Sequence, residues 1–271
     1  MTFALCQMLT YSNGKLGCHF AGRPMDPERF ILLLLPGLDG TDIFFGPLLE
    51  ELRDRVPPSC EVRVWPLPSR GAQDYATLLE ALRRELADVT ACCLLGWSFS
   101  GPLALMLAAA EPHRVRGVIL AASFLRAPQP KLRYMVWAVR GPVVWCWRVL
   151  RRVPLWLLRP RRDALRQAKD RTWREVRPGL LAERLREVAR VDARAELQAL
   201  RARDLPLMYI ASAQDGVVPR SALEQILAEY PGLWVETIPG THQSLYNHAR
   251  EAVGPIAGFS ANLVDKDRRM T

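Results

Sequence analysis

The chain has 271 residues, of which 49% are hydrophobic and 24% are charged, and its formal net charge is +9. This composition is that of a globular protein with a sizeable core, and it excludes a disordered or collagen-like chain. No stretch reaches the roughly 18 apolar residues of a membrane span, and the first residues lack the basic and apolar regions of an export signal. Six cysteines are scattered without C-x-x-C spacing. We therefore expect a soluble, cytoplasmic protein with reduced thiols.

In chain order, the first predicted element is an antiparallel hairpin, because Ser12-Asn13-Gly14 separates the apolar runs 4–10 and 15–20. From residue 30 onward, short apolar runs alternate with longer stretches of helical periodicity, which is typical of a mostly parallel sheet with helices on both faces. The expected strands are 30–35, 61–66, 91–96, 117–122, 206–211 and 233–238. The expected helices are 48–55, 75–86, 101–111 and 221–230. The predicted fold class is therefore α/β.

The middle of the chain differs from its flanks in charge and aromatic content. Residues 124–204 carry 21 basic and 8 acidic residues, together with five of the eight tryptophans. The helical patterns of this segment are interrupted by prolines and Pro-Gly pairs, at which a helix must end or kink. We therefore predict an α/β core formed by residues 1–123 and 204–271, with a helical cap, or lid, inserted at residues 124–203.

A sharp turn is predicted where the strand 91–96 meets the helix 101–111. Its sequence is Trp97-Ser98-Phe99-Ser100-Gly101, and a serine between a strand and a helix is the context of a nucleophile elbow. Residues two before and two after the serine must be small because the turn is tight. Gly96 meets this requirement, whereas Ser100 meets it only approximately and the glycine is delayed to position 101. The alternative is that Ser98 merely caps the helix.

A glycine-rich turn, Pro36-Gly37-Leu38-Asp39-Gly40-Thr41, directly follows the first expected strand of the sheet. An oxyanion hole needs backbone N–H groups aimed at the developing charge. The N–H of Leu38 and that of Phe99, the residue after Ser98, are our candidates for these two donors. The alternative is an ordinary loop between a strand and a helix.

An acid and a histidine follow later strands. Asp215 is the only acid in the loop after the strand 206–211, and His242 follows the strand 233–238 by a few residues. The chain order Ser, Asp, His is the order of triads built on a nucleophile elbow. A solvated aspartate beside Gly216 is the alternative for Asp215. We expect the remaining histidines to be structural or surface residues: His19, His113 and His248.

Together, these motifs resemble the α/β-hydrolase fold family over about residues 30 to 252. Within that family the chain is similar to carboxylesterases with an inserted helical cap that carry a Pro-Gly-Leu-Asp-Gly-Thr oxyanion loop. The stretch 190–194, followed by Leu197, resembles the family's return from the cap to the core. The sequence departs from the family pattern at Ser100, where glycine is usual, and at Pro36-Gly37, where many members have His-Gly. These departures bear on the subfamily and the substrate.

The candidate residues favour acyl transfer through a covalent intermediate on Ser98, with His242 as the base and Asp215 fixing the histidine tautomer. We expect a serine carboxylesterase for esters with short to medium apolar acyl chains. A thioesterase or an acyltransferase would use the same triad, and a non-catalytic relative is a further alternative. No cofactor or metal is expected, because the sequence lacks ligand-spaced clusters and phosphate-binding glycine motifs.

The apolar residues of the cap favour a pocket for acyl chains, with the arginines of the cap on its solvated side. The candidate substrate-binding residues are Gly37, Trp97, Trp137 and Trp145. Alternatively, the tryptophan-rich and arginine-rich stretches make a weak contact with an anionic membrane surface, as in a lipase that acts at a lipid interface. Nucleic-acid binding is not expected, because the arginines are spread over several broken helices. The expected partner is therefore a small-molecule ester, and the sequence leaves the oligomeric state open.

Overall fold

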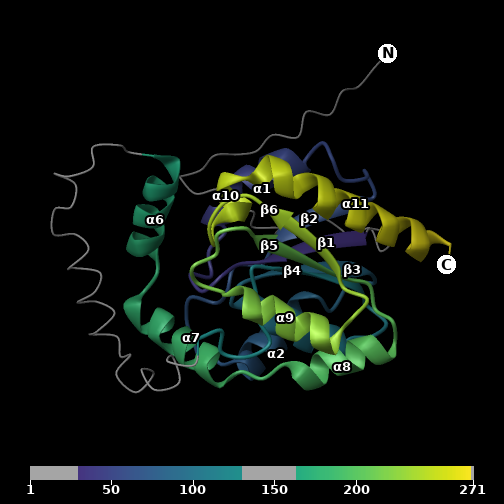
Figure 1. Cartoon of the computed structure of the whole chain (residues 1–271), viewed down its shortest axis with the longest axis horizontal. Helices are drawn as coiled ribbons and strands as arrows, with labels where there is room; N and C mark the ends of the chain where they lie inside the picture. The colour runs from purple at the N-terminus through teal and green to yellow at the C-terminus, as the bar shows by residue number, and fades with distance from the viewer. Residues whose placement is uncertain (1–29, 130–162, 270–271) are drawn as a thin grey trace, which may run out of the picture.

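A six-stranded sheet forms the centre of the protein in the computed structural model, which describes residues 30–129 and 163–269 (Figure 1). The strands lie in the order β2-β1-β3-β4-β5-β6, and every neighbouring pair is parallel. Their bounds are β1 (Phe30–Leu35), β2 (Cys60–Val64), β3 (Cys92–Trp97), β4 (Val115–Ala121), β5 (Leu207–Ser212) and β6 (Trp234–Ile238). The predicted mostly parallel sheet is therefore confirmed, and each strand begins and ends close to its expected position.

Helices cover both faces of the sheet. In Figure 1, α1, α10 and α11 lie on one face, while α2, α8 and α9 lie on the other, where α3 packs against α2 and α8. The helices of the described residues are η1 (Ile43–Phe45), α1 (Gly46–Leu52), α2 (Tyr75–Glu85), α3 (Ser100–Ala110), α6 (Ala164–Glu175), α7 (Pro178–Arg190), α8 (Arg194–Ala202), α9 (Arg220–Glu229), α10 (Ser244–Asn247) and α11 (Ala249–Arg268). The four helices expected between the strands all form.

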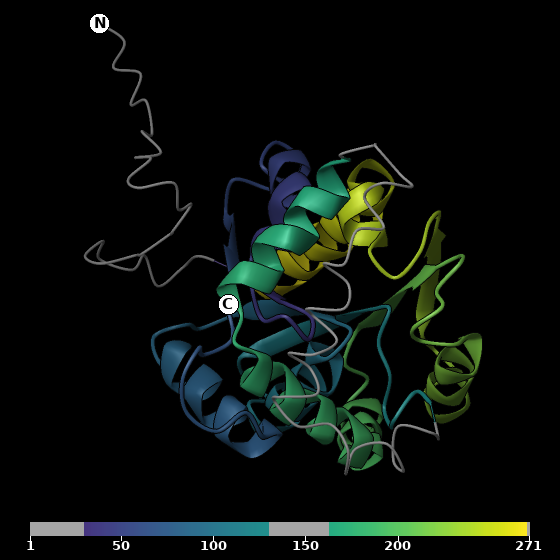
Figure 2. The same cartoon turned by 90° about the vertical axis from the view of Figure 1, so that its left-hand side faces the viewer.

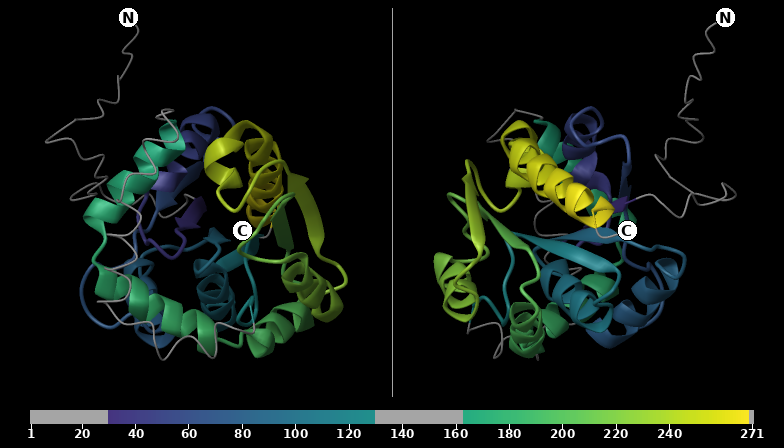
Figure 3. Two further views of the ribbon diagram at one scale, coloured as in Figure 1. Left: turned by 60° about the vertical axis from the view of Figure 1, so that its left-hand side comes forward. Right: turned by 90° about the vertical axis from the view of Figure 1, so that its right-hand side faces the viewer.

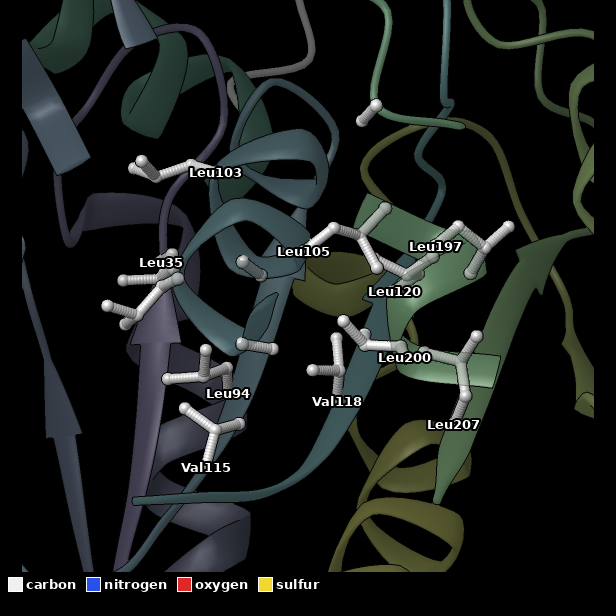
Figure 4. Close-up of a cluster of buried hydrophobic side chains, with 14 of the residues drawn as sticks. Leu35, Leu94, Leu103, Leu105, Val115, Val118, Leu120, Leu197, Leu200 and Leu207 are labelled. Carbon is white, nitrogen blue, oxygen red and sulfur yellow. The ribbon is translucent and has the colours of Figure 1, made fainter. Parts of the chain in front are cut away.

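The core has two halves because the strands are apolar on both faces. Successive side chains of a strand point to opposite faces. In β1, Ile31, Leu33 and Leu35 pack with α2, α3, α8 and α9, whereas the alternate residues pack with α1 and α11. Figure 4 shows the first half, where leucines of β3 and β4 meet those of α3 and α8. The continuous apolar runs in the sequence are therefore those of a sheet buried on both sides.

The segment predicted to form the cap leaves the sheet after β4 and returns before β5. Its two ends lie side by side, because Arg126 and Asp192 form an isolated antiparallel bridge and the N–H of Ala193 donates to the carbonyl of Leu125 at 2.9 Å. Helices α6 and α7 stand beside the core and face the viewer in Figure 2. Figure 3 shows α8 continuing this chain of helices, although α8 packs directly against α3. The cap boundaries at 124 and 203 stay a prediction.

Several expectations fall outside the described residues. These are the hairpin before residue 30, Trp137 and Trp145, and the apolar stretch of the cap around them. Within the described ranges, the search for a helix long and apolar enough to cross a membrane finds none. Three cysteines of these ranges, Cys60, Cys92 and Cys93, are buried free thiols.

Candidate active site

Ser98 lies in the tight turn between β3 and α3. Its φ is +51°, in the left-handed region that costs free energy for any residue with a Cβ. The helix passes so close to the end of β3 that a Cβ on Gly96 would lie 2.6 Å from the carbonyl oxygen of Ser100. The expectation that residue 96 must be small therefore has a direct structural reason. The strained turn holds the Ser98 side chain at the carboxyl end of the sheet.

Ser123, just after β4, anchors this turn from the neighbouring strand. Its hydroxyl donates to the carbonyl of Ser98 at 2.7 Å, and the Tyr209 hydroxyl both accepts from the Ser123 N–H at 3.0 Å and donates to its carbonyl at 2.8 Å. A Cβ on Gly101 would overlap the Ser123 side chain. The glycine at position 101 is therefore explained by the approach of Ser123, which only the folded structure brings next to it.

The structure brings Ser98, Asp215 and His242 together, although they follow three different strands. The Nε2 of His242 lies 2.9 Å from the Oγ of Ser98, and its Nδ1 lies 2.8 Å from the Oδ2 of Asp215. Ser98 and His242 are each 8% exposed. This geometry allows His242 to accept the Ser98 proton at one nitrogen while Asp215 holds the other.

The Asp215 carboxylate is fixed from both sides. Its Oδ1 accepts from the N–H groups of Val217 at 2.8 Å and Val218 at 2.9 Å, which leaves Oδ2 for His242. Burial favours the neutral form of Asp215, but the hydrogen bond and charge of His242, aided by the two N–H groups, hold its pKa below the ordinary value. Asp215 is therefore an anion at neutral pH. Ser212 and Ser244, whose hydroxyls lie 2.6 Å apart, also connect the Asp215 and His242 loops.

The carbonyl groups of the glycine-rich turn after β1 accept hydrogen bonds that fix the turn. The Ser100 hydroxyl donates to the carbonyl of Pro36, and the N–H of Gly40 donates to the carbonyl of Gly37 at 2.9 Å. Because the peptide bonds here are trans, the N–H of Leu38 points away from the Gly37 carbonyl. Neither this N–H nor that of Phe99 donates to any acceptor among the described residues. Both candidate oxyanion donors are therefore available.

Two of the candidate substrate-binding residues lie beside this site. Trp97 is buried, packs edge-on against Phe44, and has its ring centre 5.9 Å from that of His242. A Cβ on Gly37 would contact the Trp97 ring at 3.4 Å, so the turn and this indole are in close contact. Their contact with a substrate stays a prediction.

The other described histidines lie apart from Ser98, Asp215 and His242. His113 precedes β4 and so lies at the amino ends of the strands, the opposite end from Ser98. His248 separates α10 from α11, and its ring fills the space that a Cβ on Gly240 would need. His248 therefore supports the loop that carries His242. Among the described residues, no group of three or more His, Cys, Asp and Glu side chains could hold a metal ion.

One residue of this region was missed by the sequence reasoning. Arg184 of α7 is 1% exposed, whereas the arginines of this segment were expected on its solvated side. The signal was its helical spacing, because Leu181 and Val188, three before and four after it, are both buried. An arginine at that spacing faces the core, where its guanidinium reaches the turn after β1.

A parallel sheet with Ser, Asp and His in this order at its carboxyl edge is the architecture of a hydrolase. The model of the alpha/beta hydrolase family matches residues 32–254. The chain therefore belongs to the alpha/beta hydrolase family.

Individual relatives agree with this family. A pimeloyl-[acyl-carrier protein] methyl ester esterase from Neisseria meningitidis serogroup A is 27% identical over 237 residues, covering 81% of this chain and 74% of that protein. The biotin biosynthesis bifunctional protein BioHC from Cellvibrio japonicus is 26% identical over 276 residues, covering 89% of this chain and 50% of that protein. The chain thus spans about half the length of BioHC. A solved structure, described with the carboxylesterases of Nitrososphaera gargenis, has a TM-score of 0.66 at 21% identity and covers 89% of this chain and 93% of its own, which supports the shared fold.

Proposed function

We propose that the protein is a serine esterase that cleaves carboxylic esters with short to medium apolar acyl chains. The observation that carries the proposal is the hydrogen-bonded line from Ser98 through His242 to Asp215, beside two backbone N–H groups that donate to no acceptor in the described part of the chain. The esterase names of the relatives support the reaction class. Because one of them acts on the methyl ester of a carrier-bound acyl chain, methyl esters belong among the first substrates to test.

The proposed reaction has two halves. The Oγ of Ser98 forms a bond to the acyl carbon while its proton passes to Nε2 of His242, and the carbonyl oxygen becomes an anion held by the N–H groups of Leu38 and Phe99. The intermediate then expels the alcohol, which takes the proton from His242. Water, activated by the same nitrogen, releases the acid and restores Ser98.

Thioester hydrolysis and acyl transfer to another acceptor use the same acyl-enzyme, so they remain alternatives within this proposal. The absence of a cofactor or metal, a cytoplasmic location and contact of the cap with a membrane surface likewise stay predictions. The acceptor decides among the enzymatic alternatives, and it is identified by analysing the products.

The first experiment measures initial rates on p-nitrophenyl esters from acetyl to palmitoyl, together with methanol release from methyl esters of the same chain lengths. Ser98→Ala removes the nucleophile, so we expect it to lower turnover by more than the roughly 10²- to 10³-fold that loss of one oxyanion donor costs. His113→Ala is the matched control, because it removes a histidine from the opposite end of the sheet. A fluorophosphonate should form a bond from its phosphorus to the Oγ of Ser98 with loss of HF, so the protein should gain the mass of the reagent less that of HF. Equal rates for the wild type and Ser98→Ala on every ester would refute the proposal.

A further inference from the structure

Arg184 is a buried cation on α7 that binds the turn after β1, which carries the candidate oxyanion donor Leu38. Its Nη1 donates to the carbonyls of Leu38 at 3.0 Å and Asp39 at 2.8 Å. Its Nη2 donates to the carbonyl of Pro68 at 3.2 Å, and its Nε donates to the side chain of Gln73 at 2.8 Å. All four of these hydrogen bonds go to neutral oxygens. The guanidinium therefore joins α7 to the loops that follow β1 and β2.

Stability alone does not explain why a charged side chain is buried at position 184. Burial lowers the pKa of Arg184 to about 10, although the carboxylate of Asp39 favours the charged form. The side chain therefore stays charged at neutral pH, and a buried charge carries a desolvation cost that an apolar residue of similar volume does not. An apolar side chain would suit the neighbours of Arg184 on α7, Leu181 and Val188, which are both buried. The position of the cation is better explained by the groups that it holds.

Those groups are consecutive carbonyls of one turn. Ser100 binds the carbonyl of Pro36, Gly40 binds that of Gly37, and Arg184 binds the next two. Gly40 has a φ of +73°, and a Cβ there would overlap the guanidinium, so Arg184 occupies the space that this glycine leaves. Four successive peptide groups are thereby fixed, and the N–H of Leu38 lies among them.

We propose that Arg184 is a positioning residue, which holds the Leu38 N–H in line with the charge that develops on the substrate carbonyl. This inference rests on the proposed function. A preorganised donor stabilises the transition state without reorganisation, whereas a displacement of about 1 Å can cost roughly 10²-fold in rate. Arg184 touches neither the substrate nor the triad in this role, and it acts through the backbone of the turn.

The first test removes the Arg184 side chain by substitution and then supplies a free guanidinium ion in its place. Arg184→Ala is expected to lower kcat roughly 10²-fold while KM changes little, because the lost interaction is made only in the transition state. Arg184 lines a cavity of about 460 Å³ beside Gly40 and Leu67, through which a free guanidinium ion can reach the vacated place. Millimolar guanidinium should restore part of kcat to Arg184→Ala, whereas sodium at equal ionic strength should not. Arg190→Ala, at an exposed position on the same helix, is the matched control.

The second test separates positioning from stability. A trifluoromethyl ketone mimics the tetrahedral intermediate once Ser98 adds to it, whereas the product acid mimics the ground state. Binding of the ketone should weaken by the same factor as kcat/KM falls, while binding of the acid should change little. Gln73→Ala, which removes only the partner of Nε, and Arg184→Lys, which keeps a charge, should give intermediate losses of kcat. These two variants also serve if Arg184→Ala does not fold.

The outcomes distinguish the two proposals. If Arg184→Ala and Gln73→Ala unfold at lower urea concentration but keep the wild-type kcat, Arg184 is structural and the inference fails while the esterase proposal stands. Equal weakening of ketone and product binding would also overturn it. If Ser98→Ala retains the full rate, the proposed function itself fails.

Discussion

Gly101→Ala tests the packing that sets the Ser98 turn. The added Cβ would overlap the Oγ and Cβ of Ser123, while its next contact, with Leu120 at 3.4 Å, is an ordinary one. Overpacking of this kind costs about 1–3 kcal/mol, and loss of the hydrogen bond from Ser123 to Ser98 adds about 1 kcal/mol. Alanine regains about 1 kcal/mol relative to glycine within a helix. We therefore expect a net loss of about 1–3 kcal/mol from the free energy of unfolding.

The effect of Gly101→Ala on the free energy of unfolding should change sign when the side chain of Ser123 is removed. In a Ser123→Gly background both overlapping atoms are absent and the hydrogen bond is already lost, so Gly101→Ala should stabilise the protein by about 1 kcal/mol through helix propensity. The two positions should thus show a coupling energy of about 2–4 kcal/mol, at or slightly above the upper end of the range for residues in contact. Gly258→Ala in α11 is the matched control, because a Cβ there would meet open space.

Urea unfolding of the wild type, the two single variants, the double variant and the control measures this cycle. The value of kcat/KM on the best ester reports whether the Ser98 turn keeps its geometry. We expect Gly101→Ala to lower kcat/KM because the displaced helix start moves Ser98 relative to His242. If Gly101→Ala has the same effect on unfolding with and without Ser123, the close approach does not explain the glycine. The reasoning would then be refuted.

Two further substitutions address the neighbours of this turn. Asp215→Asn should lower kcat roughly 10⁴-fold by allowing the wrong histidine tautomer. Because the folded pKa of Asp215 is lowered, the stabilising effect of its carboxylate is present above the unfolded pKa of about 3.9 and is lost as the pH falls through the folded value. The difference in unfolding free energy between the wild type and Asp215→Asn should therefore shrink below about pH 4. A difference that grows as the pH falls would contradict this sign. Tyr209→Phe leaves the N–H and carbonyl of Ser123 unpaired and should cost about 1–3 kcal/mol in urea unfolding, whereas Tyr246→Phe, which removes an exposed hydroxyl, should cost little. Equal costs for the two tyrosines would show that burial of the bond does not matter.

Much of this architecture is visible in the sequence because it depends on local patterns. Continuous apolar runs bounded by glycine or proline predicted the strands to within about two residues, since a strand buried on both faces leaves no other pattern. The order of the loops along a parallel sheet also predicts that Ser98, Asp215 and His242 lie at one edge of the sheet. These inferences need only the chain order and the direction of the strands.

The supports of the site could not be predicted in this way, because they join segments far apart in the chain. Ser100 and Pro36 are 64 residues apart, and Arg184 and Leu38 are 146 apart. Ser100 was identified only as a departure from the usual glycine, and no local pattern shows that its hydroxyl reaches the turn after β1. Arg184 was hidden for a different reason, since an arginine in a basic segment is ordinarily a surface residue.

The adjacent ends of the inserted segment have a consequence for how this protein can be altered. Because Leu125 and Ala193 are hydrogen-bonded neighbours, the chain between them closes on itself, and a short linker could join the two ends without moving β4 or α8. Replacing a loop of this length by a few residues lowers its closure entropy by about 2 kcal/mol. The shortened chain would keep the six strands, but it would lose Val188 and Val191 from one half of the core, Ala168 from the other, and the hydrogen bonds of Arg184 to the Leu38 turn. Under the role proposed for Arg184, removing this segment therefore lowers turnover even in a chain whose sheet still folds.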